Sequence, residues 1–129
     1  MAMRREMEAT LRTAGLTMTQ WRALGVLRHV ASATPTDMGR ALEIEPPSVT
    51  SLLKGMERNG WIKRARSSTD ARVTHVAITA RGRRLVEQAG EVTAPVEARL
   101  AATLSAPERA TLKRLLHALV EGMGQDAGR

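Results

Sequence analysis

The chain has 129 residues and a formal net charge of +7, and this length suits one domain or one subunit of a small oligomer. It has no cysteine, which excludes disulfides, thiolate metal sites and thiol redox switches. No run of about 18 apolar residues is present and no apolar segment follows the N-terminal charges, so we expect a cytoplasmic protein without a membrane span.

The positive charge is concentrated in the middle of the chain. Residues 40–84 hold ten Lys and Arg residues against four acidic residues, whereas residues 85–129 hold five against six. A basic patch on a compact module is the electrostatic footprint of a nucleic-acid-binding protein, although an acidic membrane would attract it as well. The uneven distribution favours nucleic acid as the partner.

Two helices are predicted at the start of the chain. Residues 2–14 are expected to form the first helix, which Gly15 ends. Thr17 and Gln20 have the spacing of a capping box, in which each side chain accepts a hydrogen bond from the other residue's backbone. This pair predicts a second helix that extends to about Val30.

Two further helices follow, and a tight turn joins them. Residues 36–44 form the first, started by a Thr or Asp cap, and the turn is Glu45-Pro46. Residues 47–58 form the second, with Pro47 at the first helical position. Its apolar residues recur at i, i+3, i+4 and i+7, which predicts one buried face, made of Val49, Leu52, Leu53 and Met56. The pair is a helix-turn-helix.

A hairpin is predicted directly after this pair. Gly60 ends the second helix, and residues 61–66 and 72–78 show the pattern of strands. The polar segment 67–71 between them is a turn. A hairpin placed after a recognition helix is a wing.

The last third of the chain is predicted to be helical. Thr79 caps a long helix that Pro95 should kink or end. Ser105 and Glu108 form a second capping box, opening a helix that reaches about Met123. We expect the glycines at 122, 124 and 128 to end this helix, so that an irregular tail follows it. Its apolar stripe consists of Leu112, Leu115, Leu116, Leu119 and Met123.

The predicted geometry indicates a mode of DNA binding. If the helix 47–58 lies in the major groove, its N-terminal part meets base edges and phosphates while the wing reaches the neighbouring minor groove. Hydroxyl groups can bond to bases or phosphates, Lys and Arg can neutralise phosphates, and Pro offers only van der Waals contact. Ser48 could instead cap its helix, and both roles remain open.

The order and spacing of several motifs carry a resemblance to a known family. The motifs are Leu16-Thr17, Thr36-Asp37-Met38-Gly39, Ser48-Val49-Thr50, Arg58-Asn59-Gly60-Trp61-Ile62-Lys63-Arg64 and Asp70-Ala71-Arg72. Over about residues 16–84 the chain resembles the MarR family of bacterial transcription regulators. The resemblance implies that Arg72 enters the minor groove and that Asp70 holds its side chain in place.

Combining the residues and the resemblance gives a set of candidate DNA-binding residues. Arg64 and Arg66 are expected to follow phosphates, with a merely solvated charged hairpin as the alternative. The set is Thr36, Pro47, Ser48, Thr50, Ser51, Lys54, Arg58, Arg64, Arg66, Ser67, Asp70 and Arg72.

The expected fold is mainly α with a small antiparallel β-hairpin wing. Residues 1–15 form an N-terminal dimerisation helix, residues 16–84 the winged helix-turn-helix, and residues 85–129 C-terminal helices for dimerisation. The apolar stripes outside the winged module exceed what a subunit of this size can bury, so we expect a two-fold homodimer. An intramolecular helical cap on a monomer is the alternative.

Two functions are compatible with the sequence. The first is a sequence-specific dimeric DNA-binding regulator, a repressor that binds an inverted repeat and responds to a small-molecule effector. Trp21, Arg22 and His29 are the candidate ligand-binding residues, although Trp21 is more simply a core aromatic. The second is an architectural DNA-binding or protein-docking winged-helix protein that has no ligand.

Other chemistry finds little support in the sequence. The three histidines lie far apart with no acidic partner at ligand spacing, so we expect no metal site. No Gly-rich phosphate loop, nucleophile elbow or pair of catalytic carboxylates is present, so we expect no cofactor and no enzymatic activity.

Overall fold

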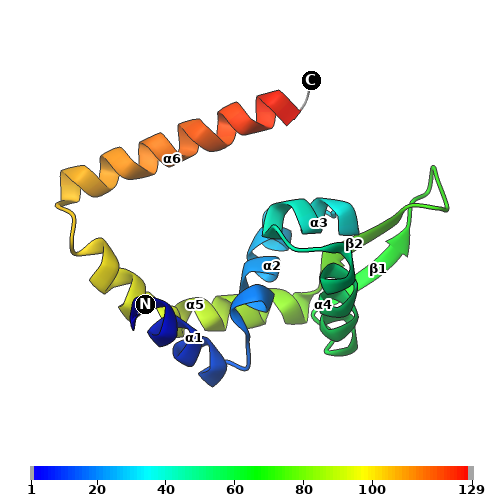
Figure 1. Cartoon of the computed structure of the whole chain (residues 1–129), viewed down its shortest axis with the longest axis horizontal. Helices are drawn as coiled ribbons and strands as arrows, with labels where there is room; N and C mark the ends of the chain where they lie inside the picture. Colours follow the sequence, from blue (N-terminus) through cyan, green and yellow to red (C-terminus); the bar gives the residue numbers. More distant parts are fainter. Residues whose placement is uncertain (1, 128–129) are drawn as a thin grey trace. The chain divides into compact units, whose positions relative to one another are not determined.

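The computed structural model describes residues 2–127, without the side chains of residue 2, residue 120 and residues 123–127. It is mainly α with a single antiparallel hairpin, which confirms the predicted fold class (Figure 1). The elements are α1 (Ala2–Thr13), α2 (Met18–Arg28), α3 (Pro35–Leu42), α4 (Pro46–Arg58), β1 (Ile62–Arg66), β2 (Thr74–Ile78), α5 (Ala80–Ala101) and α6 (Ala106–Ala127). The chain separates into two compact units, residues 1–94 and 95–129.

The first unit is built around one apolar core. Buried residues come from α1 to α5, both strands and the connecting loops. Each helix presents one stripe to this core, as expected for amphipathic helices of a small domain. The largest apolar side chains that are almost completely buried are Leu11, Leu16, Leu24, Leu27, Met38, Leu42, Leu53, Met56 and Val76, and Thr93 is a fully buried polar residue.

The predicted joint between the first two helices is confirmed. Gly15 has a φ of +79°, and the Leu16 N–H donates to the Leu11 carbonyl at 3.0 Å, which closes the end of α1. The Thr17 side chain accepts from the Gln20 N–H at 3.1 Å, and the Gln20 side chain accepts from the Thr17 N–H at 3.0 Å. The capping box therefore starts α2 as expected.

The start of α3 differs from the prediction. Its N-cap is Thr34, and the helix begins at Pro35. Thr34 forms a capping box with Asp37, with hydrogen bonds of 3.1 and 3.0 Å. Pro35 fits the first helical position, because that position needs no backbone N–H and proline has none. The N-cap is therefore Thr34, and Thr36 and Asp37 lie in the first turn of the helix.

The turn between α3 and α4 contains the one non-glycine residue with positive φ among residues 2–127. Glu43, at the end of α3, has a φ of 55°. Helix α4 then begins at Pro46, one residue earlier than predicted, with Glu45 as N-cap and no side-chain capping bond. Ser48 is the third residue of the helix, so the capping role considered for it is wrong.

The hairpin follows α4 after a sharp turn. Gly60 has a φ of +76°, and its N–H donates to the Glu57 carbonyl at 2.9 Å. Strands β1 and β2 pair antiparallel from Ile62 opposite Ile78 to Arg66 opposite Thr74, so both are slightly shorter than predicted. Ala33 adds a short bridge to Val76 that the sequence did not indicate. The turn between the strands extends away from the helices (Figure 1).

Helix α5 is attached to the end of α4 by a group of short contacts. The Thr79 hydroxyl donates to the Gly60 carbonyl at 2.6 Å and accepts from the Gly82 N–H at 3.1 Å, so Thr79 caps α5 as predicted. A Cβ on Gly82 would lie 2.3 Å from the Trp61 carbonyl oxygen. Pro95 does not end α5, which continues to Ala101, although the boundary between the two units falls at this proline.

The second unit contains the end of α5 and all of α6. The predicted capping box at the start of α6 is confirmed, because the Ser105 N–H donates to the Glu108 carboxylate at 2.8 Å and the Ser105 side chain accepts from the Glu108 N–H at 3.3 Å. The predicted end near Met123 is wrong. The helix continues through both glycines to Ala127, since a helical glycine costs only about 1 kcal/mol. The Met123 side chain and Gly128 lie outside the described residues.

Candidate nucleic-acid interface

Helix α4 presents one polar face to the solvent. Val49, Leu53 and Met56 are buried, whereas all six predicted DNA-binding residues of this helix are exposed. They are Pro47, Ser48, Thr50, Ser51, Lys54 and Arg58. Small and hydroxylated side chains stand in the first half of the helix and cations in the second half, so a phosphate backbone or a base edge can approach the N-terminal half closely.

The first turn of α4 has few backbone donors. Pro46 and Pro47 have no N–H, so the N–H of Ser48 is the first in the helix that can donate to an anion. The Thr50 hydroxyl donates to the Pro46 carbonyl at 3.1 Å, which leaves its oxygen free to accept, and the side chains of Pro46 and Pro47 are exposed. An apolar surface at this turn suits contact with a thymine methyl group.

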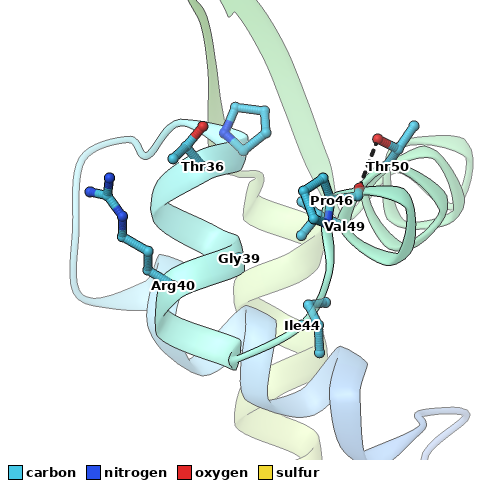
Figure 2. Close-up of a pocket in the computed structure, with 8 residues that line it drawn as sticks. Thr36, Gly39, Arg40, Ile44, Pro46, Val49 and Thr50 are labelled. Carbon is cyan, nitrogen blue, oxygen red and sulfur yellow. Dashed lines mark hydrogen bonds between the residues drawn. The ribbon is translucent and has the colours of Figure 1, made fainter.

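A shallow hollow lies between α3 and the start of α4. Its volume is about 330 Å³, and its lining includes Thr36, Ile44, Pro46 and Thr50 (Figure 2). Thr36 is exposed in the first turn of α3, so the structure brings this predicted residue next to the N-terminal half of α4. The two helix starts together form one surface.

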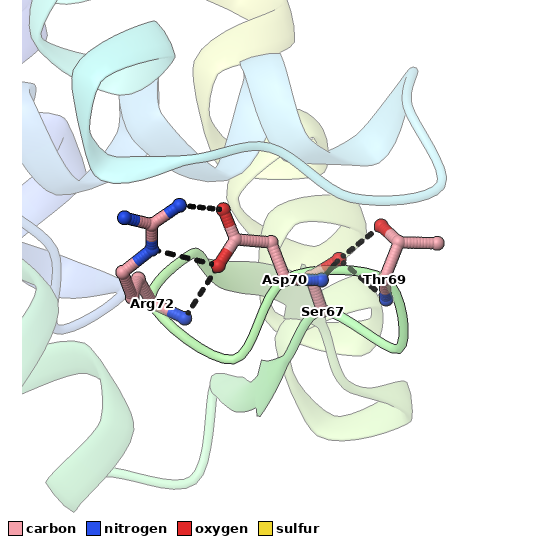
Figure 3. A network of polar contacts seen from close by, with 4 residues as sticks. All are labelled: Ser67, Thr69, Asp70 and Arg72. Carbon is pink, nitrogen blue, oxygen red and sulfur yellow. Dashed lines mark hydrogen bonds and ion pairs between the residues drawn. The ribbon is translucent and has the colours of Figure 1, made fainter.

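The wing turn is organised by a carboxylate (Figure 3). Asp70 Oδ1 accepts from the backbone N–H of Arg72 at 3.0 Å and from its Nε at 3.1 Å, and Oδ2 accepts from Nη2 at 3.3 Å. The Ser67 hydroxyl accepts from the N–H groups of Thr69 and Asp70 at 3.2 and 3.3 Å. These bonds fix the Arg72 side chain at the turn while leaving it 90% exposed.

Electrostatics reinforce this arrangement. The hydrogen bonds from the side chain and then the backbone of Arg72 lower the pKa of the Asp70 carboxyl below its ordinary value. Asp70 therefore stays ionised at neutral pH and offsets part of the local positive charge. An acid in a surface that faces phosphates is tolerable when it is paired in this way.

The two arginines of β1 differ in their surroundings. Arg66 is exposed, as a phosphate contact requires. Arg64 is only 29% exposed, and its Nε lies 3.5 Å from the Glu57 carboxylate of α4. That distance makes an ion pair without a hydrogen bond, and Nε and Nη2 of Arg64 are buried. Arg64 therefore links the wing to the end of α4, a contact that the sequence did not indicate.

The three predicted ligand-binding residues have separate surroundings. Trp21 is half-buried and packs against the core, which agrees with its simpler interpretation. The Arg22 guanidinium donates to the Leu42 carbonyl at the end of α3, at 3.3 Å. His29 is exposed at the C-cap of α2. Arg22 therefore supports the turn before α4. The sequence did not indicate this contact, because Arg22 lies in α2 and Leu42 ends α3.

The class of protein follows from this geometry. Two short helices joined by a tight turn, with a two-stranded hairpin directly behind the second, place the chain among the winged helix-turn-helix proteins, a class of DNA-binding folds. A sequence profile described as the MarR family matches residues 14–73. The chain belongs to the MarR family of transcription regulators.

Relatives support this assignment over most of the chain. A transcriptional repressor of the helix-turn-helix type from Mycobacterium tuberculosis is 30% identical over 117 residues, which cover 91% of this chain and 84% of the relative. The apo form of MarR from Escherichia coli has a TM-score of 0.76 at 27% identity and covers 92% and 88% of the two chains.

Two similar structures contain DNA. One is a mutant of the Escherichia coli MarR in complex with operator DNA, with a TM-score of 0.74, 26% identity and coverage of 92% and 85%. The other is a mutant of MepR from S. aureus bound to an oligodeoxyribonucleotide, with a TM-score of 0.68, 27% identity and coverage of 95% and 90%. The matched relatives are named as transcription regulators rather than enzymes. Within residues 2–127 no helix is long and apolar enough to cross a bilayer.

Proposed function

We propose that the protein is a sequence-specific dimeric repressor that binds an inverted repeat in double-stranded DNA and responds to a small-molecule effector. One observation carries the DNA-binding part: Arg72, fixed by Asp70, stands exposed at the wing turn, and α4 has a solvent face that is hydroxylated and then cationic. The relative named as a repressor and the operator-bound MarR structure support the same function.

In the proposed complex, α4 lies in the major groove and the wing turn lies in the adjacent minor groove. Ser48, Thr50 and Ser51 face base edges, and Lys54, Arg58 and Arg66 face phosphates. Arg72 enters the minor groove, where a narrow A·T-rich segment concentrates negative potential. The protein then acts in the cytoplasm, on the nucleoid.

The two-fold dimer is proposed on the apolar surface of the second unit. Its large apolar side chains are 46–64% exposed, which is unusual for so many residues of one short segment. They are Leu100, Leu112, Leu115, Leu116 and Leu119. Residues 1–15 and 85–129 form the dimer in this proposal and residues 16–84 bind DNA, so two recognition helices meet successive turns of an inverted repeat.

Selection of bound sequences from a random DNA pool tests the proposal, with the salt dependence of binding measured on the winning site. An enriched inverted repeat with half-sites about one helical turn apart, roughly 34 Å, is expected. Single base-pair changes in it should cost about 1–3 kcal/mol at critical positions. The alternative, an architectural binder without a ligand, predicts no enrichment and an affinity set by salt alone.

A further inference from the structure

The outermost polar contacts between the wing and the rest of the first unit lie at one level of the hairpin. On one side, the Ala33 N–H donates to the Val76 carbonyl at 2.9 Å, and the Val76 N–H donates to the Ala33 carbonyl at 2.8 Å. On the other side, Arg64 Nε lies 3.5 Å from the Glu57 carboxylate of α4. Arg64 and Val76 stand opposite each other in the hairpin. Both contacts therefore hold the same pair of residues.

The part of the wing beyond this level is a lever arm (Figure 1). In the chain from 2 to 127, the hydrogen bonds and ion pairs of residues 65–75 stay within the hairpin. From Arg64 to Thr69 at the turn the arm is roughly 16 Å long, at about 3.3 Å per residue. A rotation of about 10° at Arg64 would move the turn by roughly 3 Å, which is about half the width of a minor groove.

The position of the Arg64 side chain depends on Glu57. Nε and Nη2 of Arg64 are buried and have no hydrogen-bond partner within residues 2–127. Among the acidic residues of that range, Glu57 is the one that forms an ion pair with Arg64. A partly buried cation without a counter-charge is unfavourable, so Arg64 should turn toward the solvent if Glu57 loses its charge. The arm would then be held by Ala33 alone.

Glu57 connects this arm to the recognition helix. It lies in the last turn of α4, and its carbonyl accepts from the Gly60 N–H at 2.9 Å, which fixes it at the helix end. The candidate base contacts come from the first half of the same helix, and the candidate minor-groove contact, Arg72, comes from the arm. The angle between arm and helix therefore decides whether both can contact one segment of DNA at the same time.

We propose that Glu57 and Arg64 are positioning residues of the DNA interface, which hold the wing at the angle to α4 that lets Arg72 reach the minor groove. The pair thereby sets the separation between the base pairs that α4 contacts and those that the wing contacts. The proposal rests on the function proposed above. It gives Arg64 a different part from the phosphate contact that the sequence suggested.

The angle of the wing can be measured without DNA. Because the chain has no cysteine, Ser51→Cys on α4 and Ser68→Cys at the wing turn would carry the only two spin labels of each chain. Dilution with unlabelled protein removes distances between different chains. The distribution of distances between the two labels should become clearly broader with Glu57→Gln, which keeps the size of the side chain and removes its charge. An unchanged distribution would overturn the proposal.

Three further variants make this measurement specific. Glu87→Gln is the matched control, because Glu87 is exposed on α5 and forms no ion pair within residues 2–127. It should leave the distribution unchanged. Arg64→Met should broaden the distribution as Glu57→Gln does, and the two substitutions together should broaden it no further, because one interaction is lost in all three cases. Additive broadening would show that the two side chains act separately and would reject the pair.

Urea unfolding shows whether these variants stay folded. An ion pair between partly exposed side chains contributes little to stability, so the unfolding midpoints of Glu57→Gln and Glu87→Gln should nearly coincide. A broad distance distribution at an unchanged midpoint therefore reports the angle of the wing rather than partial unfolding.

Sequence preference on the selected operator gives a second test. Glu57→Gln should weaken binding by about three- to tenfold, which is the size of a typical coupling between contacting residues. The preference should relax at the base pairs under the wing turn and stay at those under α4. Removing a negative charge from a surface that faces phosphates raises DNA affinity by itself, so a loss of affinity would not come from the change of charge.

The variant Arg72→Ala separates positioning from an independent effect. In this background Glu57→Gln should weaken binding by less than about twofold, because the wing no longer has a minor-groove contact to misplace. A full effect in this background would overturn the proposal. So would a salt slope lower by about one in Arg64→Met with unchanged sequence preference, which would identify Arg64 as a phosphate contact.

Failure of this proposal is distinguishable from failure of the proposed function. If the DNA selection finds no operator while the label distances respond to Glu57→Gln and Arg64→Met, the function fails and the pair still fixes the angle of the wing. If an operator is found and the label distances do not respond, the function stands and the positioning pair is rejected.

Discussion

Single side chains at the wing turn show how an exposed arginine can be ordered without being buried. Arg72 is 90% exposed, yet three hydrogen bonds join it to Asp70. A long side chain normally loses rotamer entropy when it is inserted into a groove. The pairing with Asp70 removes part of that cost before DNA arrives, which is preorganisation at the scale of one residue.

Replacing Arg72 tests its role in base recognition. Arg72→Ala should weaken binding to the selected operator by about 1–3 kcal/mol and relax the preference for A·T pairs where the wing turn lies. Arg66→Ala is the matched control, because loss of a phosphate contact should weaken all sequences alike and reduce the salt slope by about one. Binding isotherms at several salt concentrations separate the two effects. An unchanged sequence preference in Arg72→Ala would contradict minor-groove recognition.

A second residue with a strict requirement is Gly82. A Cβ at this position would lie 2.3 Å from the Trp61 carbonyl oxygen and 2.8 Å from Cγ1 of Ile78, and the backbone oxygen cannot move away cheaply. Gly82→Ala should therefore lower the free energy of unfolding by about 1–3 kcal/mol, as overpacking does. Urea unfolding measures this change.

Gly25→Ala in α2 is the control for this substitution. No heavy atom lies within 4 Å of a Cβ built there, so alanine should raise the free energy of unfolding by about 0.4–1 kcal/mol. Equal effects of the two substitutions would show that the contact with Trp61 does not constrain α5.

At the scale of elements, α4 differs from the other helices in how its N-terminus is stabilised. Three capping boxes start α2, α3 and α6, whereas α4 starts with two prolines and no side-chain cap. The orientation of α4 therefore depends on its neighbours, namely the turn at Glu43, the Arg22 contact with Leu42 and the attachment of Thr79 to Gly60. All three lie outside the helix itself.

The capping box of α3 should give the protein a pH dependence. Hydrogen bonds with the backbone and then the side chain of Thr34 lower the pKa of Asp37 below its ordinary value of 3.8. Because the folded pKa is the lower one, this contribution to stability is complete above about pH 4 to 5 and is lost as the pH falls through the folded pKa. Asp37→Asn should show a smaller loss of unfolding free energy between about pH 7 and pH 2.

Thr34→Ala removes the other half of the box and should cost about 1 kcal/mol at neutral pH. Thr36→Ala, two residues further along, is exposed and makes no capping bond, so it should change the free energy of unfolding by less than about 0.5 kcal/mol. Urea unfolding at several pH values measures all three variants. If Asp37→Asn kept the pH dependence of the unchanged chain, another carboxylate would have to be responsible.

Much of this architecture could be predicted from the sequence because its signals are local. The spacing of Val49, Leu53 and Met56, the capping pairs at Thr17 and Ser105, and the glycine at position 60 each act within one or two turns of chain. The start of α3 was predicted too late because Thr36 is also a good capping residue, and only the proline before it excludes that role. Local patterns compete when several residues suit one position.

The parts that the sequence did not indicate are contacts between distant segments. Arg22 with Leu42, Arg64 with Glu57 and Ala33 with Val76 depend on how the helices pack, and no periodicity in the sequence encodes them. A hollow lined by Trp61, Arg81 and Arg84 also escaped prediction, because its arginines come from α5 and Trp61 from the turn after α4. The count of Lys and Arg residues in the sequence includes these arginines, but it does not show which of them lack an acidic partner.

At the scale of the whole molecule, the two compact units differ in how completely they bury apolar surface. Residues 1–94 enclose a core, whereas α6 leaves four leucines 46–64% exposed. Exposed apolar surface of this extent on a single helix is typical of an interaction surface. The function proposed above requires a second copy of the chain to cover it.

The exposed stripe of α6 provides a test of the dimer. Leu116→Glu combined with Leu119→Glu should convert the dimer into a monomer in light scattering at micromolar concentration. The fold of the single chain should change little, because both side chains are more than half exposed in it, at 51% and 64%. The monomer should also bind an inverted repeat far more weakly, since linked half-sites act with a high effective concentration.

Arg114→Glu is the control for this pair, because it changes charge on the same helix away from the leucine stripe. It should leave the mass of the dimer unchanged. A double leucine variant that remains dimeric would place the dimer contacts elsewhere on the chain.

The turn after α4 has a consequence for how the protein ages in storage. Asn followed by Gly is the sequence most prone to deamidation, in which the backbone nitrogen of the glycine attacks the asparagine side chain and isoaspartate results. Here that sequence is Asn59-Gly60, and the Gly60 N–H is held by the Glu57 carbonyl at 2.9 Å. The folded chain should therefore resist this reaction, and isoaspartate at position 59 should accumulate only in molecules that have unfolded.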